Sequence, residues 1–299
     1  MVLVSAIVTT CKRDPHIVER ALKSVLSQTY RNIEIIVVDD SPREYPLRLK
    51  VKSMIEAYND GAMRIEYAMH EENRGACVAR NTGVALSHGT IVGFLDDDDE
   101  WLPNKVESMI KKFDDQKVAL VYGDTIYCDD DRAKRIIEKR PKHRGMVYDK
   151  LIWKNFIGST SFPLIRKDPL VLVGGFDELM QSAQDVELYL RLSQSYEIDY
   201  VDEVIAIYHG SKSERISNNV DKKIAGLERL IEVNREYLNV NSSAFWIRKI
   251  RITPYYAKKG DIIKAISVWF ECVKMRPMFV VGNIKYLLCV LLWYFWRRW

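Results

Sequence analysis

The stretch that decides the fold covers residues 90–101 and reads Thr90-Ile91-Val92-Gly93-Phe94-Leu95-Asp96-Asp97-Asp98-Asp99-Glu100-Trp101. Its apolar first half predicts a buried strand. Four carboxylates follow directly, and like charges this close to one another repel strongly. A hard divalent cation that also bridges diphosphate oxygens would neutralise them. The stretch therefore favours a metal-assisted enzyme that acts on a nucleotide-activated substrate.

Strand-like and helix-like patterns alternate on both sides of this stretch. Short apolar runs predict strands at residues 3–8, 33–38, 64–68, 90–95 and 118–122. Helical spacing predicts helices after Asp14-Pro15 and at residues 47–58, 77–86 and 103–113. The alternation predicts an α/β fold with a mostly parallel sheet between helices. Ligands of such sheets bind where the strands end, so we expect Asp39-Asp40 and the Asp96 run to converge.

The pattern is less regular after Asp124. Residues 126–138 suggest a hairpin that turns at Asp129-Asp130-Asp131, followed by a helix at 185–195 and a strand at 198–208. Beyond residue 216 the segments are helical, basic and aromatic. We therefore predict a catalytic domain at residues 1–215 and a helical region at 216–299.

The composition is that of a globular protein, with 47% hydrophobic and 29% charged side chains over 299 residues. The five cysteines are scattered, and none forms a CxxC pair. Neither a disulfide framework nor a zinc site is expected, which favours a reducing cytoplasm. Residues 2–8 are too short for a signal peptide and are better interpreted as the first strand.

Charge is distributed unevenly along the chain. Residues 245–299 hold eleven Lys or Arg against two acids, a local charge of +9, while the rest of the chain carries about −5. Nucleic acid could explain a basic segment. This one is also rich in Trp, Tyr, Phe and Leu, which suits an anionic membrane surface better. We therefore expect a membrane partner and no nucleic-acid partner.

Several polar residues near the predicted strand ends are candidate functional residues, and most of them also have a structural alternative. Asp39 could cap a turn or bind a nucleotide base and ribose, and Arg80 is a cation placed to meet phosphate. Asp185 at a helix start could be a cap or a general base. His209 alone is more often structural, but it stands with Ser211 in a run of phosphate-binding residue types.

Taken in order, these segments resemble the family 2 glycosyltransferases, which have the GT-A fold. The matching segments are residues 4–10, 25–30, 35–41, 73–83, 94–103, Gly174-Gly175-Phe176-Asp177, 185–192 and 208–211. Each segment alone is a weak signal, but the ordered set is specific and covers residues 1–215. The resemblance implies a mixed, mostly parallel Rossmann-like sheet with flanking helices, followed by the C-terminal helical region.

The resemblance also implies roles for residues in the donor site. Thr10 and Asp39 would hold the nucleotide base, and Asp97 would lie near its ribose. Asp98 would bind the cation, Mn²⁺ or Mg²⁺, in a DxD motif that begins at Asp96.

Two further roles and three departures follow from the same comparison. Asp185 matches the catalytic base, and His209 matches a position that often contacts metal or diphosphate. Thr9 replaces a proline and Cys11-Lys12 replaces a Tyr-Asn pair, which removes an aromatic contact with the base. Gln184 replaces an acid beside Asp185, so we expect a base whose pKa is less raised rather than an inactive enzyme.

The C-terminal segment leaves three alternatives open. Residues 278–296 are almost wholly apolar and approach the length that spans a bilayer, but Gly282-Asn283 and Lys285 interrupt them. The helices could pack on the catalytic domain, lie on the membrane or cross it. Peripheral attachment on the cytoplasmic face is the preferred interpretation.

The sequence thus predicts an inverting, metal-dependent glycosyltransferase. Its donor would be a nucleotide sugar, most simply UDP-linked, and its acceptor a saccharide hydroxyl, most simply lipid-linked as in polysaccharide assembly. A nucleotidyltransferase would need a glycine-rich loop after the first strand, and residues 9–14 contain no glycine. A catalytically silent nucleotide-sugar-binding scaffold is the other alternative, favoured by Gln184. The sugar, the acceptor and the oligomeric state stay open.

Overall fold

The structure is a computed structural model, and it describes residues 1–59, 61, 63–129, 132–210 and 219–275. The chain divides into two compact units. The first comprises Met1–Leu151, Asn155–Glu178 and Leu188–Lys212, and the second comprises Ile152–Lys154, Leu179–Glu187 and Ser213–Trp299.

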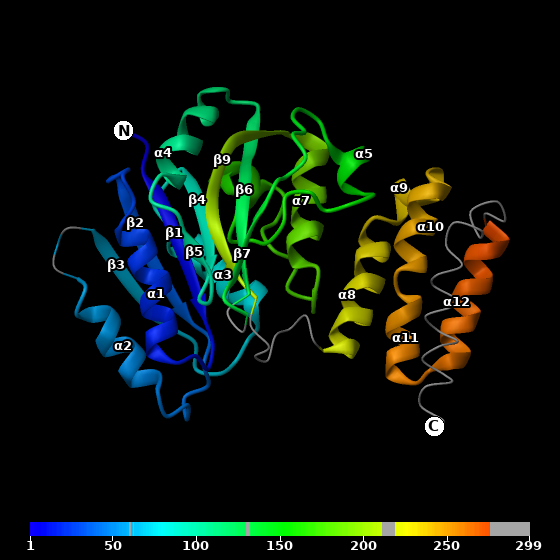
Figure 1. The fold of residues 1–299 in the computed structure, drawn as a ribbon, viewed down its shortest axis with the longest axis horizontal. Coiled ribbons are helices and arrows are strands. Elements are labelled where there is room, and N and C mark those ends of the chain that lie inside the picture. Colours follow the sequence, from blue (N-terminus) through cyan, green and yellow to red (C-terminus); the bar gives the residue numbers. More distant parts are fainter. Residues whose placement is uncertain (60, 62, 130–131, 211–218, 276–299) are drawn as a thin grey trace. The chain divides into compact units, whose positions relative to one another are not determined.

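The first unit is built on one mixed sheet, whose strands except β8 are labelled in Figure 1. In chain order the strands are β1 (Val4–Thr10), β2 (Ile33–Asp39), β3 (Arg64–Met69), β4 (Ile91–Asp96), β5 (Glu100–Trp101), β6 (Val118–Asp129), β7 (Lys134–Glu138), β8 (Leu164–Arg166) and β9 (Glu197–His209). Their order across the sheet is β3-β2-β1-β4-β8-β6-β9-β5, and β7 pairs with β6.

Strand direction divides the sheet into two parts. Strands β3, β2, β1 and β4 are parallel neighbours. Strand β8 is antiparallel to both β4 and β6, while β9 runs parallel to β6. Because β1, β2 and β4 are parallel, the segments that follow them leave the sheet at a single edge.

The helices of the first unit begin where the sequence provides start signals. The Asp14 carboxylate caps α1 by accepting a hydrogen bond from the His16 backbone N–H at 2.9 Å, and Pro15 occupies the first turn. The helical elements that lie wholly in this unit are α1 (Pro15–Leu26), α2 (Arg48–Glu56), α3 (Ala76–Leu86), α4 (Lys105–Ile110), η1 (Lys111–Asp114), α5 (Tyr148–Leu151) and α6 (Lys167–Leu172). Helix α7 (Gln184–Ser195) begins within residues 179–187, which are grouped with the second unit.

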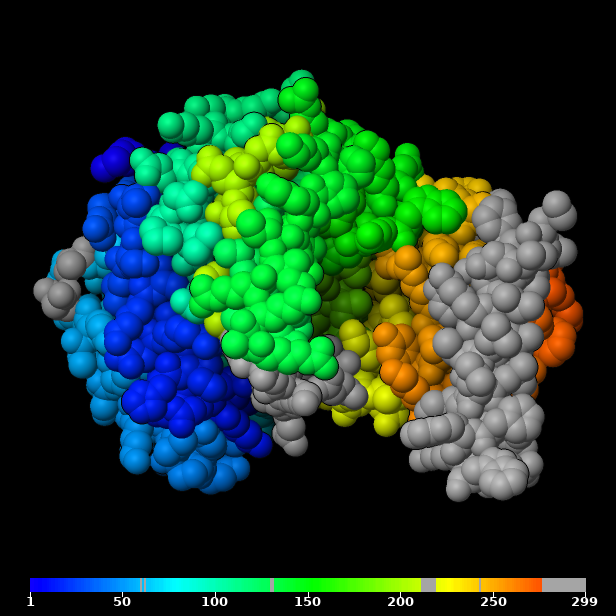
Figure 2. Space-filling view, viewed as in Figure 1, coloured from blue at the N-terminus to red at the C-terminus, as the bar shows by residue number. Residues whose placement is uncertain are grey.

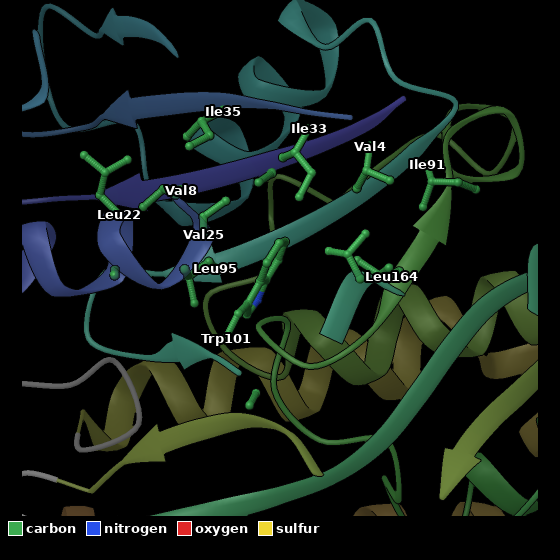
Figure 3. Close-up of a cluster of buried hydrophobic side chains, with 14 of the residues drawn as sticks. Val4, Val8, Leu22, Val25, Ile33, Ile35, Ile91, Leu95, Trp101 and Leu164 are labelled. Carbon is green, nitrogen blue, oxygen red and sulfur yellow. The ribbon is translucent and has the colours of Figure 1, made fainter. Parts of the chain in front are cut away.

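Successive side chains of each strand lie on opposite faces of the sheet. Val4 and Val8 of β1 pack with Leu22 and Val25 of α1 in the main apolar cluster, and Figure 3 shows Trp101 beside them. Ile7, which precedes Val8, lies on the other side of the sheet. The buried strands therefore read as continuous apolar runs, as is usual for a sheet covered on both faces.

The opposite face is covered by α3, where Gly83 allows a close approach to β1. A Cβ atom placed on Gly83 would lie 2.3 Å from Cγ2 of Ile7. Both residues are buried. Helix α3 can therefore pack this close to the strand only because residue 83 has no side chain.

The second unit contains five helices among its described residues in addition to the start of α7. They are α8 (Val220–Val233), α9 (Arg235–Val240), α10 (Ser242–Ile250), α11 (Thr253–Lys259) and α12 (Ile262–Met275). Trp246, Ile250, Tyr256, Val268 and Cys272 form its apolar core. Parts of these helices are visible in Figure 2, where they are coloured yellow to orange-red. None of the helices in the described ranges is both long enough and apolar enough to cross a membrane.

The predicted α/β class is confirmed, and so are most of the elements. The first four predicted strands and the helix after Asp14-Pro15 occur within one or two residues of their predicted bounds. The hairpin is present as β6 and β7, although Asp130 and Asp131 of its turn lie outside the described residues. Strands β5 and β8 were not predicted, because two or three residues are too few to show a period. The segment 278–296 also lies outside the described residues.

Replacing Gly83 by alanine should destabilise the protein by about 1–3 kcal/mol, the usual range for overpacking. Alanine favours helix over glycine by about 1 kcal/mol, so propensity alone predicts the opposite sign. Urea denaturation would measure the change. In an Ile7→Ala background the same substitution should be much less destabilising, and an equal effect in both backgrounds would contradict the proposed contact.

Candidate functional site

The carboxyl ends of β1, β2 and β4 form one edge of the sheet. Thr10 lies opposite Asp39 in the β1–β2 register, and Thr9 lies opposite Asp96 in the β1–β4 register. The structure thus brings together the ends of these three strands, as the strand order requires. We call residues 96–100, from the last residue of β4 to the first residue of β5, the acid turn.

Asp97 of the acid turn is buried and contacts the first strand and the loop after it. Its carboxyl oxygen Oδ1 accepts a hydrogen bond from Nε of Arg13 at 2.9 Å, and the Thr10 side chain also hydrogen-bonds to it. Burial raises the pKa of Asp97 to about 7, against the opposing charge of Arg13. This carboxyl is therefore poised to exchange a proton near neutral pH.

The Asp98 side chain is 20% exposed, compared with 5% for Asp97 and 30% for Asp96. Its Oδ2 lies 3.4 Å from Nη2 of Arg13. Its backbone oxygen accepts a hydrogen bond from Nη2 of Arg20 at 2.8 Å. Two arginines thus contact Asp98, the residue predicted to bind the cation. Arg13 contacts its carboxylate, and Arg20 contacts its backbone oxygen.

Asp96 is paired with Arg80 of α3. The guanidinium Nη2 lies 2.7 Å from Oδ1 of Asp96 and the group stacks over the Phe176 ring at 5.3 Å. Although burial alone would lower the pKa of Arg80, the charge and hydrogen bond of Asp96 together raise it. The hydroxyl of Thr160 lies 3.4 Å from the same carboxylate. The sequence suggested that Arg80 would meet a phosphate. In this structure its guanidinium instead forms an ion pair with the Asp96 carboxylate.

Asp39 and Asp40 differ in what they bind. Asp39 accepts hydrogen bonds from the Tyr67 hydroxyl at 2.6 Å and from the Ser41 backbone N–H at 2.8 Å. Burial and the hydrogen bond to Asp39 raise the pKa of Tyr67, so its hydroxyl stays protonated and donates to Asp39. Asp40 instead accepts from the backbone N–H groups of Arg74 and Gly75, both at 2.8 Å. Asp40 therefore holds the loop before α3 in place, and Asp39 is fixed at the end of β2.

His209 ends β9 and lies beside the acid turn. Its Nε2 is 2.6 Å from Oε1 of Glu100, and its backbone N–H donates to Oδ1 of Asp99 at 3.3 Å. The hydrogen bond from His209 lowers the pKa of Glu100. Ser211, which the sequence placed with His209 in a run of phosphate-binding residue types, lies outside the described residues.

Behind the acid turn lies a buried lysine. Lys105 donates to the backbone oxygen of Ser161 at 3.0 Å and to that of Phe162, and its Nζ lies 4.7 Å from the Trp101 ring centre. Burial holds the pKa of Lys105 well below its usual value, and Asp99 opposes that shift. Burial also raises the pKa of Asp99, helped by the neighbouring carboxylates.

Trp101 fixes the far end of the acid turn. Its indole N–H donates to the backbone oxygen of Ser161 at 3.0 Å, and its backbone N–H donates to the Ser24 hydroxyl at 3.1 Å. It pairs with Ala206 of β9. The acid turn is thus held between two buried points, the end of β4 and the side chain of Trp101.

Asp185 lies in the first turn of α7 and is partly exposed. The preceding Gln184 donates from Nε2 to the backbone oxygen of Met180 at 3.0 Å. A glutamate carboxylate could not donate this hydrogen bond, which gives a physical reason for the amide at position 184. The acidic neighbour that the resemblance implied is therefore replaced by a residue with a role in holding the segment before α7.

The sequence matches the family described as "Glycosyl transferase family 2" over residues 5–172, which is more than half of the chain. The chain belongs to glycosyl transferase family 2. This glycosyltransferase is 31% identical over 215 residues to an Escherichia coli K12 protein named putative colanic acid biosynthesis glycosyl transferase WcaA, covering 69% of the chain and 72% of that protein. It is 28% identical over 187 residues to an Escherichia coli protein named UDP-Glc:alpha-D-GlcNAc-diphosphoundecaprenol beta-1,3-glucosyltransferase WfgD, covering 62% of the chain and 68% of that protein.

Two solved structures resemble the glycosyltransferase in fold. Residues 1–349 of S. aureus TarS in complex with UDP-GlcNAc superpose with a TM-score of 0.67 at 17% identity, covering 91% of this chain and 79% of that chain. A mannosyltransferase, PcManGT from Pyrobaculum calidifontis, in complex with GDP-Man and Mn²⁺, gives 0.58 at 18% identity, covering 99% and 88%. The predicted GT-A fold is confirmed.

The acid turn of this glycosyltransferase fits a cation whose ligands come partly from the protein and partly from the substrate. The described part of the chain has no group of three or more His, Cys, Asp or Glu side chains placed to hold a metal ion. Nucleotide-binding Mg²⁺ and Mn²⁺ typically use one or two carboxylates and take their other ligands from phosphate and water. The Asp98 carboxylate fits this role, because it is partly exposed and already contacts a cationic group.

Sequence reasoning missed Arg13, Arg20 and Lys105. Arg13 stands just after the first strand and Arg20 lies in the helix that follows, so their position after a strand end was a usable signal. Lys105 gave no signal, because a lysine in a predicted helix is normally exposed.

Asp99→Asn and Lys105→Met should each destabilise the glycosyltransferase by about 1–3 kcal/mol, since both side chains are buried and hydrogen-bonded and their charges interact. The double variant should lose clearly less than the sum of the two. Chemical denaturation would measure all three. Lys111→Met, on the exposed next turn, serves as the control and should change stability by less than about 0.5 kcal/mol. Strictly additive losses would contradict a coupled pair.

Proposed function

We propose that this chain is an inverting, metal-dependent glycosyltransferase that moves a sugar from a UDP-linked donor to a saccharide hydroxyl. The acceptor is carried on a lipid, and the reaction takes place on the cytoplasmic face of a membrane during surface polysaccharide assembly. Residues 1–215 form the catalytic domain, and residues 216–299 form the membrane-contacting region.

The observation that carries the proposal is the arrangement of acidic side chains at one edge of the sheet. Thr10 and Asp39 lie opposite one another in the register, and the acid turn follows the neighbouring strand. Asp39 is held by Tyr67 and Ser41 in a fixed position from which a carboxylate can accept a base or ribose hydrogen bond. Asp98 presents a partly exposed carboxylate at the same edge, after β4, with β1 between that strand and β2.

Names and ligands of related proteins support the choice of donor and acceptor. WfgD is named for transfer from UDP-Glc to a diphosphoundecaprenol-linked sugar, and WcaA for colanic acid biosynthesis. TarS was solved with UDP-GlcNAc. The proposed UDP-sugar donor has the chemistry printed for WfgD and TarS, and the proposed lipid-linked acceptor has the chemistry printed for WfgD.

The mechanism assigns each step to residues of this chain. Thr10, Asp39 and Asp97 hold the nucleoside, and Asp96 and Asp98 face the diphosphate. A cation bound at Asp98 would offset the negative charge that grows on the leaving diphosphate. Arg80, by neutralising Asp96, keeps the total negative charge of the edge low enough to accept an anionic donor.

Asp185 acts as the general base in the transfer step. It takes the proton from the acceptor hydroxyl, whose oxygen forms the new bond to the anomeric carbon. The bond from that carbon to the phosphate oxygen breaks, and the nucleoside diphosphate leaves with the electron pair. Attack from the face opposite the leaving group inverts the anomeric configuration.

Asp185→Asn should reduce sugar transfer by at least about 100-fold, the usual contribution of a general base. Binding of UDP in the presence of Mn²⁺ should be unchanged, because the base does not hold the donor. Transfer would be followed with radiolabelled UDP-sugars and a lipid-linked acceptor, and binding by calorimetry.

Asp168→Asn is the matched control, since Asp168 is an exposed acid in the first turn of another helix, α6. It should leave both transfer and binding unchanged. A wild-type protein that binds UDP-sugars but transfers nothing would support the scaffold alternative instead. A wild-type protein that binds no nucleotide sugar would refute the proposal.

The membrane assignment is supported by helix α12. Ile263 and Phe270 are 86% and 53% exposed, and the spacing of seven residues puts them on one helix face with the exposed Lys274. Residues 245–299 carry a net charge of +9. Exposed apolar side chains together with excess positive charge favour the surface of an anionic bilayer.

The double variant Ile263→Glu/Phe270→Glu should weaken binding to phosphatidylglycerol-containing vesicles by at least about tenfold, because it adds two negative charges and removes two apolar contacts. Vesicle flotation would measure binding. Leu49→Glu/Leu172→Glu makes the same kind of change at exposed positions of α2 and α6 and should have little effect. Equal losses in both variants, or no wild-type binding, would overturn the membrane assignment.

A further inference from the structure

Arg13 contacts two carboxylates of the acid turn at once. Its Nε lies 2.9 Å from Oδ1 of Asp97, and its Nη2 lies 3.4 Å from Oδ2 of Asp98. The Arg13 side chain is 23% exposed, while the Asp97 side chain is only 5% exposed. The positive charge of Arg13 therefore lies next to Asp98, the carboxylate proposed to hold a divalent cation.

The loop that carries Arg13 is ordered on both sides of it. Lys12 has a positive φ of 51°, and its backbone N–H donates to the Ser41 hydroxyl at 2.8 Å. On the other side, Asp14 caps α1. A non-glycine residue in the left-handed region is uncommon and needs such support. The Arg13 side chain is thus the part of this loop that can change partner while the backbone stays in place.

Other groups hold the acid turn in place, so Arg13 is not needed for that purpose. Arg20 binds the backbone oxygen of Asp98, and Thr10 hydrogen-bonds to Asp97. Trp101, the residue after the acid turn, is fixed in the core by its indole hydrogen bond to Ser161. What Arg13 supplies is positive charge at Asp97 and Asp98 (Asp96 has its own partner, Arg80).

We infer that Arg13 is an exchangeable counter-cation, which neutralises Asp97 and Asp98 in the donor-free enzyme and moves to the donor diphosphate when a divalent cation takes its place on Asp98. This inference rests on the proposed function, because it assumes a cation and a nucleoside diphosphate at this edge. A divalent ion and a guanidinium compete for one carboxylate, and a diphosphate offers the released guanidinium the bidentate contact that it prefers.

The exchange has a thermodynamic consequence for ligand binding. In the donor-free enzyme a divalent cation must displace Arg13, so the cation alone binds weakly. When the diphosphate is present, the displaced guanidinium gains a new partner and both ligands bind more tightly. Coupling between two ligands is reciprocal, so the diphosphate must strengthen cation binding by the same factor as the cation strengthens diphosphate binding.

Calorimetry with MnCl₂ alone, UDP alone and the two together would test the exchange in the full-length protein. Arg13→Gln should bind Mn²⁺ alone at least about fivefold more tightly than the wild type, because a competing charge within 4 Å has been removed. The same variant should bind UDP at saturating Mn²⁺ about tenfold more weakly, since a charge-assisted contact is lost. The coupling factor between the two ligands should therefore fall.

Two further variants make the result interpretable. Arg13→Lys keeps the charge and should bind Mn²⁺ alone as the wild type does. Arg31→Gln removes the same charge before β2, at the opposite ends of the strands, and should change neither affinity. Thermal melting would confirm that each variant is folded.

The possible failures are distinguishable. If the wild type binds Mn²⁺ and UDP together but Arg13→Gln has unchanged Mn²⁺ affinity, Arg13 is not an exchangeable counter-cation and the proposed function stands. If Arg13→Gln binds Mn²⁺ alone more weakly, Arg13 supports the cation rather than competing with it, and the inference is wrong. If the wild type binds neither probe, the proposed function and the inference fail together.

Discussion

The structure depends on local compensation of charge in the acid turn. Five consecutive carboxyl groups at the end of a buried strand would repel one another by several kcal/mol if they were left without partners. Within the described residues each interacts with a cationic or hydrogen-bonding group of another element. Asp96 pairs with Arg80, Asp97 and Asp98 share Arg13, and Glu100 pairs with His209. Asp99 accepts a hydrogen bond from the His209 backbone N–H and interacts electrostatically with Lys105. A loop, two helices and the last long strand therefore meet at this turn.

The parallel half of the sheet and its acidic edge could be predicted from the sequence. Apolar runs gave β1 to β4 almost to the residue, because buried strands of a parallel sheet are apolar on both faces. Asp14 and Pro15 located the start of α1, because a cap and a first-turn proline are local signals. The placement of Asp39 and the acid turn at one edge of the sheet followed from strand direction alone.

The partners of the acids could not be predicted in the same way. Contacts such as Arg80 with Asp96 join residues that neither periodicity nor turn chemistry relates to each other, so only the folded chain shows them. A buried lysine such as Lys105 contradicts the general preference for exposed charge, and its environment exists only after β8, α4 and the acid turn have packed. Strand β5 depends on pairing with β9 and has no independent signal of its own.

Fixing both ends of the acid turn, at β4 and at Trp101, has a consequence for recognition. Few residues lie between these anchors, so the backbone of the turn has little freedom to lose when a ligand arrives. Binding is then opposed mainly by the ordering of the ligand itself, which is what preorganisation of a site means. Sites of this kind discriminate by shape and charge more than by adaptation, because a poorly fitting ligand cannot be accommodated by bending the loop.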